Sequence, residues 1–484
     1  MKLWRMRRVS YLGPVLIVVA CAVPLALWAQ AAPFGLRFGG SAATLRSIAV
    51  LCGLAGITAF ACNLVIGGRF ATLEPLFGSL DRMYRVHHRT GVTSFLLLLA
   101  HGVLMLASAA TDSLGAAVRL VLPAPNWTVT IGALALLAMS VVTGLTLYAR
   151  LGHEVYLWVH RVFGAVFALG ALHAFRTPGT KALSPALTIY LAIAVAAGVA
   201  AYAYRSLLGD LLVRRRYFRV TDINRRGGEV SEITLDPLGS QLDFTPGQFV
   251  FLTFQSRSMS EQFRPFSRER FGQSELVSLR AGAIRKQFHP FSITSSPARR
   301  ELQVAIKASG DYTGALRHLE VGDQAWIEGP YGRFSHLHVE SPRQVWIAGG
   351  IGVTPFLSMA RSLDERGAGS AGPQDERAGS AGPQDEHTYD VDLYYATKSR
   401  SVAYFIDDFE ALARDHPGLH LIVYPEDECG FLTAAEIERR SGPLDDVDVL
   451  MCGPLGMMEA LSDQFRGRGV ERARIHYEEF GFIR

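Results

Sequence analysis

Four histidines form two pairs with the same spacing, and each pair falls in an apolar stretch long enough to cross a membrane. His88 and His101 are 13 residues apart, as are His160 and His173, and an arginine follows the first histidine of each pair. Ionisable residues are costly inside a membrane and therefore indicate function. At about 1.5 Å rise per residue, the members of a pair lie about 20 Å apart along the helix, within a hydrocarbon core of about 30 Å. Two such helices side by side could hold two haems at two depths.

His87 is an alternative ligand to His88. Thirteen residue steps at about 100° each leave two side chains about 140° apart around a straight helix, whereas 14 steps nearly complete whole turns. His87 lies 14 residues before His101, but His88 shares with the second pair both the 13-residue spacing and the following arginine. We therefore predict His88, His101, His160 and His173 as the iron ligands, with His87 as the rival of His88.

Length and composition predict a membrane protein of several domains. The 484 residues exceed what one hydrophobic core usually serves, and 49% of them are hydrophobic. The five cysteines show no CxxC or zinc-type spacing, which argues against a disulfide framework or an iron–sulfur site. The net charge of +4 is small, and the basic residues follow a membrane-topology pattern, so no nucleic-acid partner is indicated.

Six apolar stretches approach the roughly 20 residues that a membrane helix needs. They are Val9–Trp28, Leu45–Ile66, His88–Ala109, Trp127–Tyr148, Val155–Phe175 and Ala186–Leu208. Arginine and lysine gather at the N-terminus, between spans two and three, near Arg150 and after span six, so the positive-inside rule puts both termini in the cytoplasm. Spans three and five then run in the same direction, which pairs His88 with His160 and His101 with His173. Ala29–Ala31 resembles a signal-peptidase site, but cleavage would leave the remaining topology unchanged.

The chain changes character at Tyr217, where short alternating segments predict the antiparallel strands of a small β-barrel. One segment offers an imidazole, an aromatic ring and hydroxyls along an extended backbone, which suits a flavin and its phosphate arm. It comprises His289, Pro290, Phe291, Ser292, Ile293, Thr294 and Ser295. Lys307, Gly310 and Thr313 follow it, and glycine permits close backbone approach to a phosphate.

The last part of the chain alternates strands and helices, as in a doubly wound α/β sheet. A strand at Val345–Ala348 leads through a glycine-rich turn into a helical run, which is the arrangement that binds a pyrophosphate. The turn supplies Gly349, Gly350, Gly352, Thr354 and Pro355, and a later strand ends at Cys452, Gly453 and Pro454. Lys398 and Arg400 follow another strand and could hold the 2′-phosphate of NADPH, although solvated loop charges are equally consistent with the pattern. A terminal aromatic, Phe480, could stack on the flavin.

Together these features resemble the NADPH oxidase and ferric reductase superfamily over nearly the whole chain. The six spans, the histidine pairs on spans three and five, the His-Pro-Phe-Ser run, the glycine-rich turn, the Cys-Gly-Pro strand end and the terminal aromatic occur in the family order. The resemblance implies FAD at His289, Phe291, Ser292, Thr294 and Thr313, NADPH at Gly350, Gly352 and Thr354, Cys452 beside the nicotinamide, and Phe480 over the flavin. It also implies two b-type haems between the third and fifth spans.

An insertion departs from the family pattern and leaves the flavin segment open to two assignments. Gln262–Ser267 reads Gln-Phe-Arg-Pro-Phe-Ser and echoes the Gln-Phe-His-Pro-Phe-Ser of residues 287–292. The copy with Arg264 is close to the flavin signature of soluble ferredoxin reductases. We favour the copy with His289, because Ile293–Pro297 continues the family pattern.

The sequence thus predicts three domains: a six-helix transmembrane haem domain at residues 1–212, an FAD-binding β-barrel at 213–340 and an NADPH-binding α/β domain at 341–484. A duplicated Ala/Gly/Pro/Gln segment predicts a flexible loop at about 364–388. The expected enzyme resides in the cell membrane and passes electrons from cytoplasmic NADPH, or NADH, through FAD and two haems to oxygen or ferric iron on the far side. The alternative is a membrane-anchored flavoreductase with a cytoplasmic or quinone acceptor and structural histidines.

Overall fold

The computed structural model describes residues 12–121, 127–149, 151, 153–177, 184–255, 288–367 and 389–478. Contacts divide the chain into two compact units, residues 2–213 and residues 214–484, and each unit is described by itself. Both copies of the duplicated segment, the Arg264 copy of the flavin motif and Phe480 lie outside the described residues.

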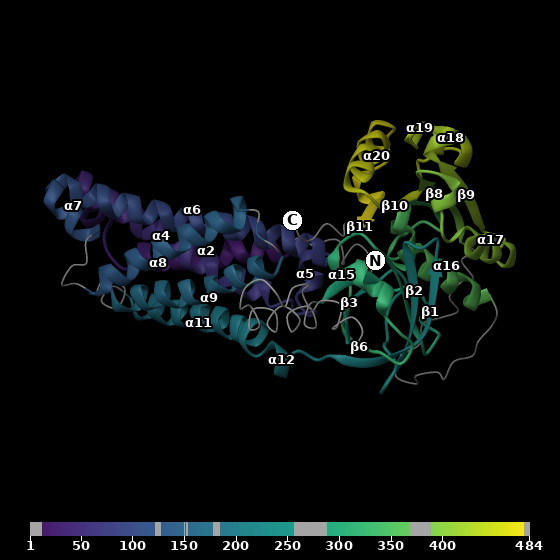
Figure 1. The fold of residues 1–484 in the computed structure, drawn as a ribbon. Coiled ribbons are helices and arrows are strands. Elements are labelled where there is room, and N and C mark those ends of the chain that lie inside the picture. Colours follow the sequence, from purple (N-terminus) through teal and green to yellow (C-terminus); the bar gives the residue numbers. More distant parts are fainter. Residues whose placement is uncertain are drawn as a thin grey trace, which may run out of the picture. The chain divides into compact units, whose positions relative to one another are not determined.

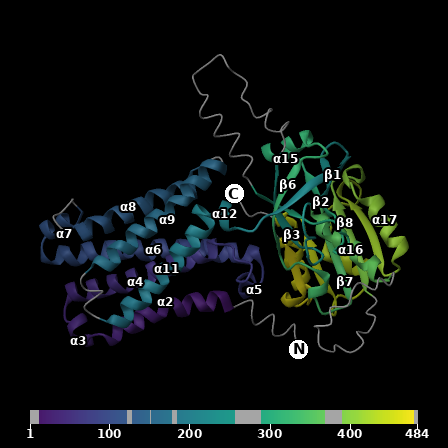
Figure 2. The same cartoon turned by 90° about the horizontal axis from the view of Figure 1, so that it is seen from below.

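The first unit is a bundle of long apolar helices that lie side by side (Figures 1 and 2). Within the described ranges, six helices are long and apolar enough to cross a membrane, as predicted. They are α2 (Leu12–Gln30), α4 (Ser41–Gly67), α6 (Leu80–Asp112), α8 (Trp127–Tyr148), α9 (His153–Arg176) and α11 (Pro185–Tyr202), which continues as a π-helical turn at Ala203–Leu207. Short helices α3 (Phe34–Arg37), α5 (Glu74–Phe77), α7 (Leu114–Val121) and α12 (Gly209–Leu212) accompany them.

Aromatic and aliphatic side chains from several helices fill the centre of this bundle. Phe60 of α4 packs edge-on against Phe167 of α9, and both are buried. Leu191 of α11 and Met139 of α8 belong to the same cluster. Large apolar side chains are also exposed on the outside of the bundle, such as Val18 of α2, Leu96 of α6 and Leu137 of α8, as expected where lipid replaces water as the surrounding solvent.

The second unit begins with a six-stranded antiparallel sheet. Its strands are β1 (Arg216–Arg226), β2 (Val230–Pro237), β3 (Phe249–Gln255), β4 (His289–Ser292), β5 (Leu302–Lys307) and β6 (Gln324–Tyr331), in the order β4-β3-β6-β1-β2-β5. Helix α15 (Asp311–Ala315) follows β5. Alternate residues such as Phe218, Ile233 and Val304 fill the core of this sheet.

This is the antiparallel sheet predicted for the small β-barrel domain, and no closed barrel is formed among the described residues. In the described part of the chain, its edge strands β4 and β5 meet at a single bridge, Ile293 with Val304. Beyond that bridge, the N–H of Thr294 donates to the Gln303 carbonyl at 2.8 Å, while the carbonyl groups of Thr294 and Ser295 accept hydrogen bonds from helix α16. The last residues of the flavin segment are therefore held by the nucleotide-binding half.

A five-stranded parallel sheet follows, as predicted for a doubly wound α/β fold. It contains β7 (Arg343–Gly349), β8 (Asp390–Thr397), β9 (Leu419–Pro425), β10 (Asp448–Cys452) and β11 (Ile475–Glu478), in the order β11-β10-β7-β8-β9. Helices α16 (Thr354–Gly367) and α17 (Ile406–Asp415) pack against one face, and α19 (Ala434–Ser441) and α20 (Leu455–Gly467) against the other. A short helix, α18 (Glu426–Cys429), follows β9. Because α16 extends to Gly367, the first residues of the predicted 364–388 loop are helical.

Side-chain alternation along β7 explains the two helical layers. Trp346 and Ala348 face the α16 side, whereas Val345 and Ile347 face the α20 side, and all four are fully buried. The strand order reverses between β7 and its neighbour β10, which begins the other half of the sheet. Ligands of doubly wound sheets bind at such a switch point, beyond the carboxyl ends of the strands.

Candidate functional site

A stripe of polar side chains runs along the face of α6 that packs on α4. Every seventh residue contributes one hydrogen bond to a backbone carbonyl of α4. The pairs are His87 to Asn63 at 3.1 Å, Ser94 to Gly56 at 3.0 Å, His101 to Ala49 at 2.8 Å and Ser108 to Ala42 at 2.9 Å. Seven residues turn a helix by nearly two whole turns, so these side chains line one face. The stripe fixes the register of two antiparallel helices and aims two imidazoles at α9.

His87, and not His88, faces the second histidine helix. The ring of His87 lies 6.0 Å from that of His160, and the ring of His101 lies 6.3 Å from that of His173. His88 is exposed on another side of α6. The structure therefore brings His87, the alternative to His88, into contact with His160, because the 14-residue spacing from His101 returns the side chain to the same face.

Within each pair, the two imidazoles are spaced as two histidines that would hold one haem iron between them. A metal–nitrogen distance of about 2 Å on each side would place two such ring centres about 6 Å apart. Nδ1 of His87, His101 and His173 is held by a backbone carbonyl, that of Thr128 at 2.7 Å for His173, which leaves Nε2 for iron. Among the described residues, no group of three or more His, Cys, Asp or Glu side chains is placed to hold a bare metal ion.

The fourth ring, that of His160, is positioned by packing instead of a hydrogen bond. Its buried Nδ1 has no hydrogen-bond partner in the described part of the chain. The ring stacks on Tyr156, with centroids 5.6 Å apart and planes 17° apart, and meets Phe163 edge-on at 5.3 Å. The two histidine pairs therefore differ in how firmly their rings are oriented.

Glycines on neighbouring helices make room for the histidine rings. A Cβ atom at Gly53 would lie 2.9 Å from Nδ1 of His101, and one at Gly132 would lie 2.6 Å from Nδ1 of His173. A Cβ at Gly67 would meet the His87 ring at 3.4 Å. Small residues of this kind allow close helix approach in membranes. None of these glycines was singled out from the sequence, although each lies in a helix of membrane-spanning length.

Replacing Gly132 with alanine is expected to displace the His173 ring, because the new methyl group would overlap it and break its hydrogen bond to Thr128. If that ring binds a haem, the purified variant loses up to about half of its total haem, measured as the pyridine haemochrome. Gly144→Ala is the matched control, because Gly144 lies on the same helix with nothing within 4 Å of the added carbon. Equal haem contents in the two variants would contradict the proposed ligand role of His173.

The flavin segment is divided by the structure into an open part and a buried part. His289, Pro290 and Phe291 lie on the edge strand β4 and are half-buried. The ring of His289 stacks on Tyr312 with centroids 4.1 Å apart. Burial raises the pKa of Tyr312 to about 12, even though hydrogen bonds with Thr253 and Phe254 lower it, so this phenol stays neutral. The open part of β4 offers an imidazole and an aromatic ring to a planar ligand.

The buried part begins at Ser292. Ile293 points into the core of the sheet, and Thr294 and Ser295 are fully buried. Their carbonyl oxygens accept hydrogen bonds from Arg361 at 2.9 Å and from Ser358 at 2.7 Å. The hydroxyl of Thr294 has no hydrogen-bond partner among the described residues. These buried residues thus attach the end of the flavin segment to helix α16.

The residues predicted to bind phosphate near α15 make local contacts. Lys307 pairs with exposed Glu229 at 3.2 Å. The hydroxyl of Thr313 accepts hydrogen bonds from the N–H groups of Ser309 and Gly310 at 2.9 and 3.0 Å, which caps α15. A Cβ at Gly310 would meet nothing within 4 Å. Gly310 is exposed, so its backbone is accessible to a ligand.

The glycine-rich turn and the Cys-Gly-Pro strand end are packed against each other. β7 and β10 are neighbours, with Ala348 in register with Cys452. A Cβ at Gly352 would lie 2.3 Å from the carbonyl oxygen of Cys452, and one at Gly453 would lie 2.9 Å from Cα of Gly349. Only glycine permits these backbone approaches. The two motifs, about a hundred residues apart, therefore form one surface at the switch point of the sheet.

The other residues of the turn prepare the start of α16. Gly350 has a φ of +55°, where an L side chain would be strained, and open space around its Cα. The Thr354 hydroxyl donates to the carbonyl of Ile351 at 3.0 Å. Pro355 occupies the first turn of the helix, where its missing N–H costs nothing. A 14-residue helix then presents its N-terminus next to the turn, as a pyrophosphate requires.

Cys452 is fully buried at the end of β10. Burial raises the pKa of its thiol well above the usual range, and the charge of Glu478 raises it further. The thiol is therefore neutral and a poor nucleophile. If a nicotinamide binds beside it, Cys452 would offer a small, uncharged side chain and no nucleophile.

Lys398 and Arg400 lie beyond the carboxyl end of β8, and both are exposed. Neither forms an ion pair with another described residue. They are accessible at the edge of the sheet where the adenosine end of a dinucleotide binds in such folds. The structure therefore leaves both cations available for a 2′-phosphate.

Three family models match the chain in succession. The ferric reductase like transmembrane component matches residues 52–171, the FAD-binding domain residues 272–335, and the oxidoreductase NAD-binding domain residues 346–463. The chain has the architecture of the NADPH oxidase and ferric reductase superfamily. It combines a ferric reductase like transmembrane component with an FAD-binding domain and an oxidoreductase NAD-binding domain. The FAD-binding match includes the His289 copy of the duplicated motif and excludes the Arg264 copy.

Curated relatives resemble part of the chain. A flavohemoprotein of Rhizobium meliloti (strain 1021) is 25% identical over 288 residues, which cover 55% of this chain and 60% of the relative. The reductase component of propane 2-monooxygenase from Rhodococcus jostii (strain RHA1) is 24% identical and covers 57% of this chain and 66% of the relative. The chain thus spans about 60% of the length of the flavohemoproteins it matches. Among solved structures, the flavohem-like FAD/NAD-binding domain of nitric oxide dioxygenase from Vibrio cholerae is 24% identical, with a TM-score of 0.40 over 54% of this chain and 97% of that chain.

Proposed function

We propose that this oxidoreductase passes electrons from cytoplasmic NADPH through FAD and two b-type haems to an acceptor on the far side of the membrane. The observation that carries the proposal is the pair of facing imidazole sets, His87 with His160 and His101 with His173, whose ring separations of 6.0 and 6.3 Å suit bis-histidine iron. A flavoreductase with structural histidines would need no such matched spacing.

The proposed cofactors divide the chemistry between them: bound FAD would convert the two electrons of a hydride into single electrons, and bound haems would relay these. The protein's part is to orient each group. The backbone carbonyls of Asn63, Ala49 and Thr128 fix three imidazole tautomers, while Tyr156 stacks against the fourth ring. Bis-histidine iron has no open position, so the acceptor would receive electrons at the haem edge without a dedicated catalytic side chain.

In the cytoplasmic half, we assign the FAD to the open side of β4, at His289 and Phe291, with Ser292 nearest the buried part of the segment. We assign the NADPH pyrophosphate to the Gly349–Thr354 turn, the nicotinamide to the region of Cys452, and the 2′-phosphate to Lys398 and Arg400. Phe480 would cover the flavin. These assignments are supported by the packing of the two nucleotide motifs at one strand edge.

The proposal also includes the three-domain division at residues 212 and 340, a cell-membrane location and cytoplasmic termini. The positive-inside distribution of arginine and lysine supports this orientation. Oxygen and ferric iron are the acceptors that the haem-edge mechanism allows, since both accept single electrons.

The test is a reduced-minus-oxidised spectrum of the purified full-length chain in detergent. Two low-spin b haems and one FAD per chain are expected, with NADPH bleaching the flavin before the haems are reduced. Parallel assays of superoxide formation and ferric-chelate reduction in one preparation then identify the acceptor. Flavin without haem would overturn the proposal in favour of a tethered flavoreductase.

A further inference from the structure

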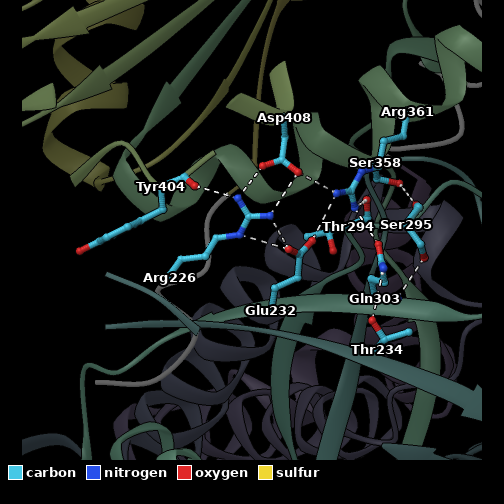
Figure 3. Close-up of polar contacts among 10 residues, drawn as sticks. All are labelled: Arg226, Glu232, Thr234, Thr294, Ser295, Gln303, Ser358, Arg361, Tyr404 and Asp408. Atoms are coloured by element: carbon cyan, nitrogen blue, oxygen red, sulfur yellow. Dashed lines mark hydrogen bonds and ion pairs between the residues drawn. The ribbon is translucent and has the colours of Figure 1, made fainter. Parts of the chain in front are cut away.

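A ring of four charged side chains joins the antiparallel flavin sheet to the helices of the nucleotide-binding half (Figure 3). Arg226 of β1 lies 2.8 Å from Glu232 of β2 and 2.5 Å from Asp408 of α17. Arg361 of α16 closes the ring, because its Nη2 lies 3.3 Å from both carboxylates. The four side chains are 7% to 20% exposed, so salt screens these pairs less than surface pairs.

The two arginines differ in what else they hold. Burial alone would lower the pKa of Arg226, but its hydrogen bonds with Asp408 and Glu232 raise the pKa overall. Its guanidinium also donates to the Tyr404 carbonyl at 3.1 Å and lies 4.7 Å from the centroid of the Phe405 ring. Arg361 instead directs Nη1 to the carbonyl of Thr294 at 2.9 Å and to Oε1 of Gln303 at 2.8 Å. Of the two arginines, Arg361 is the one that contacts the flavin segment, as Figure 3 shows.

Helix α16 therefore links two parts of the site. It begins at Thr354, directly after the glycine-rich turn, and two of its residues hold the backbone of the flavin segment. Ser358 donates to the carbonyl of Ser295 at 2.7 Å, and Arg361, nearly one turn later, holds the carbonyl of Thr294. A helix is stiff over this length, so the distance between the turn and the segment depends on these two contacts.

We propose that Arg361 is a positioning residue for hydride transfer, which fixes the flavin segment relative to the nucleotide turn through α16. This inference rests on the proposed function, in which the hydride passes from the nicotinamide to the flavin. Transfer requires reacting atoms at about 3–3.5 Å, and a misplacement of about 1 Å can cost a hundredfold in rate. Ser358 assists from the preceding turn.

The matched pair of variants is Arg361→Ala and Arg226→Ala in the full-length protein. Each removes one arginine from the ring and leaves Glu232 and Asp408 with one cation, but only Arg361→Ala frees the Thr294 carbonyl. Anaerobic flavin bleaching by NADPH, followed by stopped flow, is expected to slow about tenfold to a hundredfold in Arg361→Ala and to stay near the parent rate in Arg226→Ala. Bleaching by dithionite needs no nicotinamide and should be unchanged in both.

Two readouts separate positioning from a general loss of stability. With NADPH deuterated at C4, the isotope effect on flavin reduction should rise in Arg361→Ala, because hydride transfer becomes more rate-limiting. Without nucleotide, amide exchange in the 289–304 segment should quicken in Arg361→Ala more than in Arg226→Ala. Ser358→Ala provides a milder variant if Arg361→Ala does not fold, with slower bleaching and unchanged FAD content expected.

Equal slowing in the two arginine variants, or an unchanged isotope effect and unchanged exchange, would overturn the positioning role. The same holds if Ser358→Ala bleaches at the parent rate when Arg361→Ala cannot be purified. A failure of the parent chain to bleach with NADPH would instead overturn the proposed function, and the exchange comparison would still decide whether Arg361 holds the segment.

Discussion

Replacing His87 with alanine is expected to remove one of the two proposed haems, whereas replacing the adjacent His88 is expected to leave both. The ring of His87 lies 6.0 Å from that of His160 and its Nδ1 is held by Asn63, so it alone at this level of α6 is oriented toward a second imidazole. His88 is exposed. Loss of one axial ligand from a bis-histidine site should leave about half of the haem per chain.

The measurement is the haem content and the low-temperature b-type spectrum of both purified variants, compared with the parent. His88→Ala is a stringent control, because it removes the same chemical group one residue away on the same helix. In His87→Ala, NADPH should still bleach the flavin but should no longer reduce the remaining haem at the parent rate. Full haem in His87→Ala together with loss in His88→Ala would restore the 13-residue pairing and refute the assignment made from the structure.

The choice between His88 and His87 shows which sequence pattern informs on the helix face. The repeated His-Arg pair is a local pattern, and it favoured His88, which the structure leaves exposed while His87 faces His160. The informative pattern was the seven-residue repeat of His87, Ser94, His101 and Ser108, which places four polar groups on one helix face. Polar side chains in a membrane seek hydrogen-bond partners, so this stripe could have identified the face that packs on α4.

The flavin segment illustrates a different limit. Its composition predicted an extended, ligand-binding segment, and residues His289–Ser292 do form the strand β4. The burial of Thr294 and Ser295 depends on Arg361 and Ser358, which lie more than 60 positions later in the chain. No local sequence pattern predicts a contact between the end of a strand and a helix of another domain.

Helices and strands were easier to predict from the sequence, because each has a characteristic local spacing of apolar residues. Apolar stretches of membrane-spanning length predicted all six long helices, and the strand-turn-helix alternation predicted the parallel sheet. The closeness of the Gly349–Gly352 turn to Cys452 follows from strand order, which residue spacing does not specify. That contact is the basis of the prediction for the Gly352→Ala variant.

Replacing Gly352 with alanine is expected to reduce NADPH-dependent flavin bleaching about a hundredfold while leaving dithionite bleaching intact. The added Cβ would lie 2.3 Å from the carbonyl oxygen and 2.6 Å from the carbonyl carbon of Cys452. Both are backbone atoms of a central strand, so no side chain can move aside, and the turn must shift away from β10. Gly456→Ala is the matched control, because Gly456 lies in the first turn of α20 with nothing within 4 Å of the added carbon.

The Gly352 result discriminates between a nucleotide turn and a turn that only stabilises the sheet. A shifted pyrophosphate site should weaken NADPH binding and slow bleaching, yet FAD content should persist because the flavin segment is held through α16 by Ser358 and Arg361. Stopped-flow bleaching over a range of NADPH concentrations separates the binding constant from the limiting rate. If Gly352→Ala unfolds the domain, FAD content and dithionite bleaching fall together; if it bleaches as fast as Gly456→Ala, the turn does not bind the nucleotide.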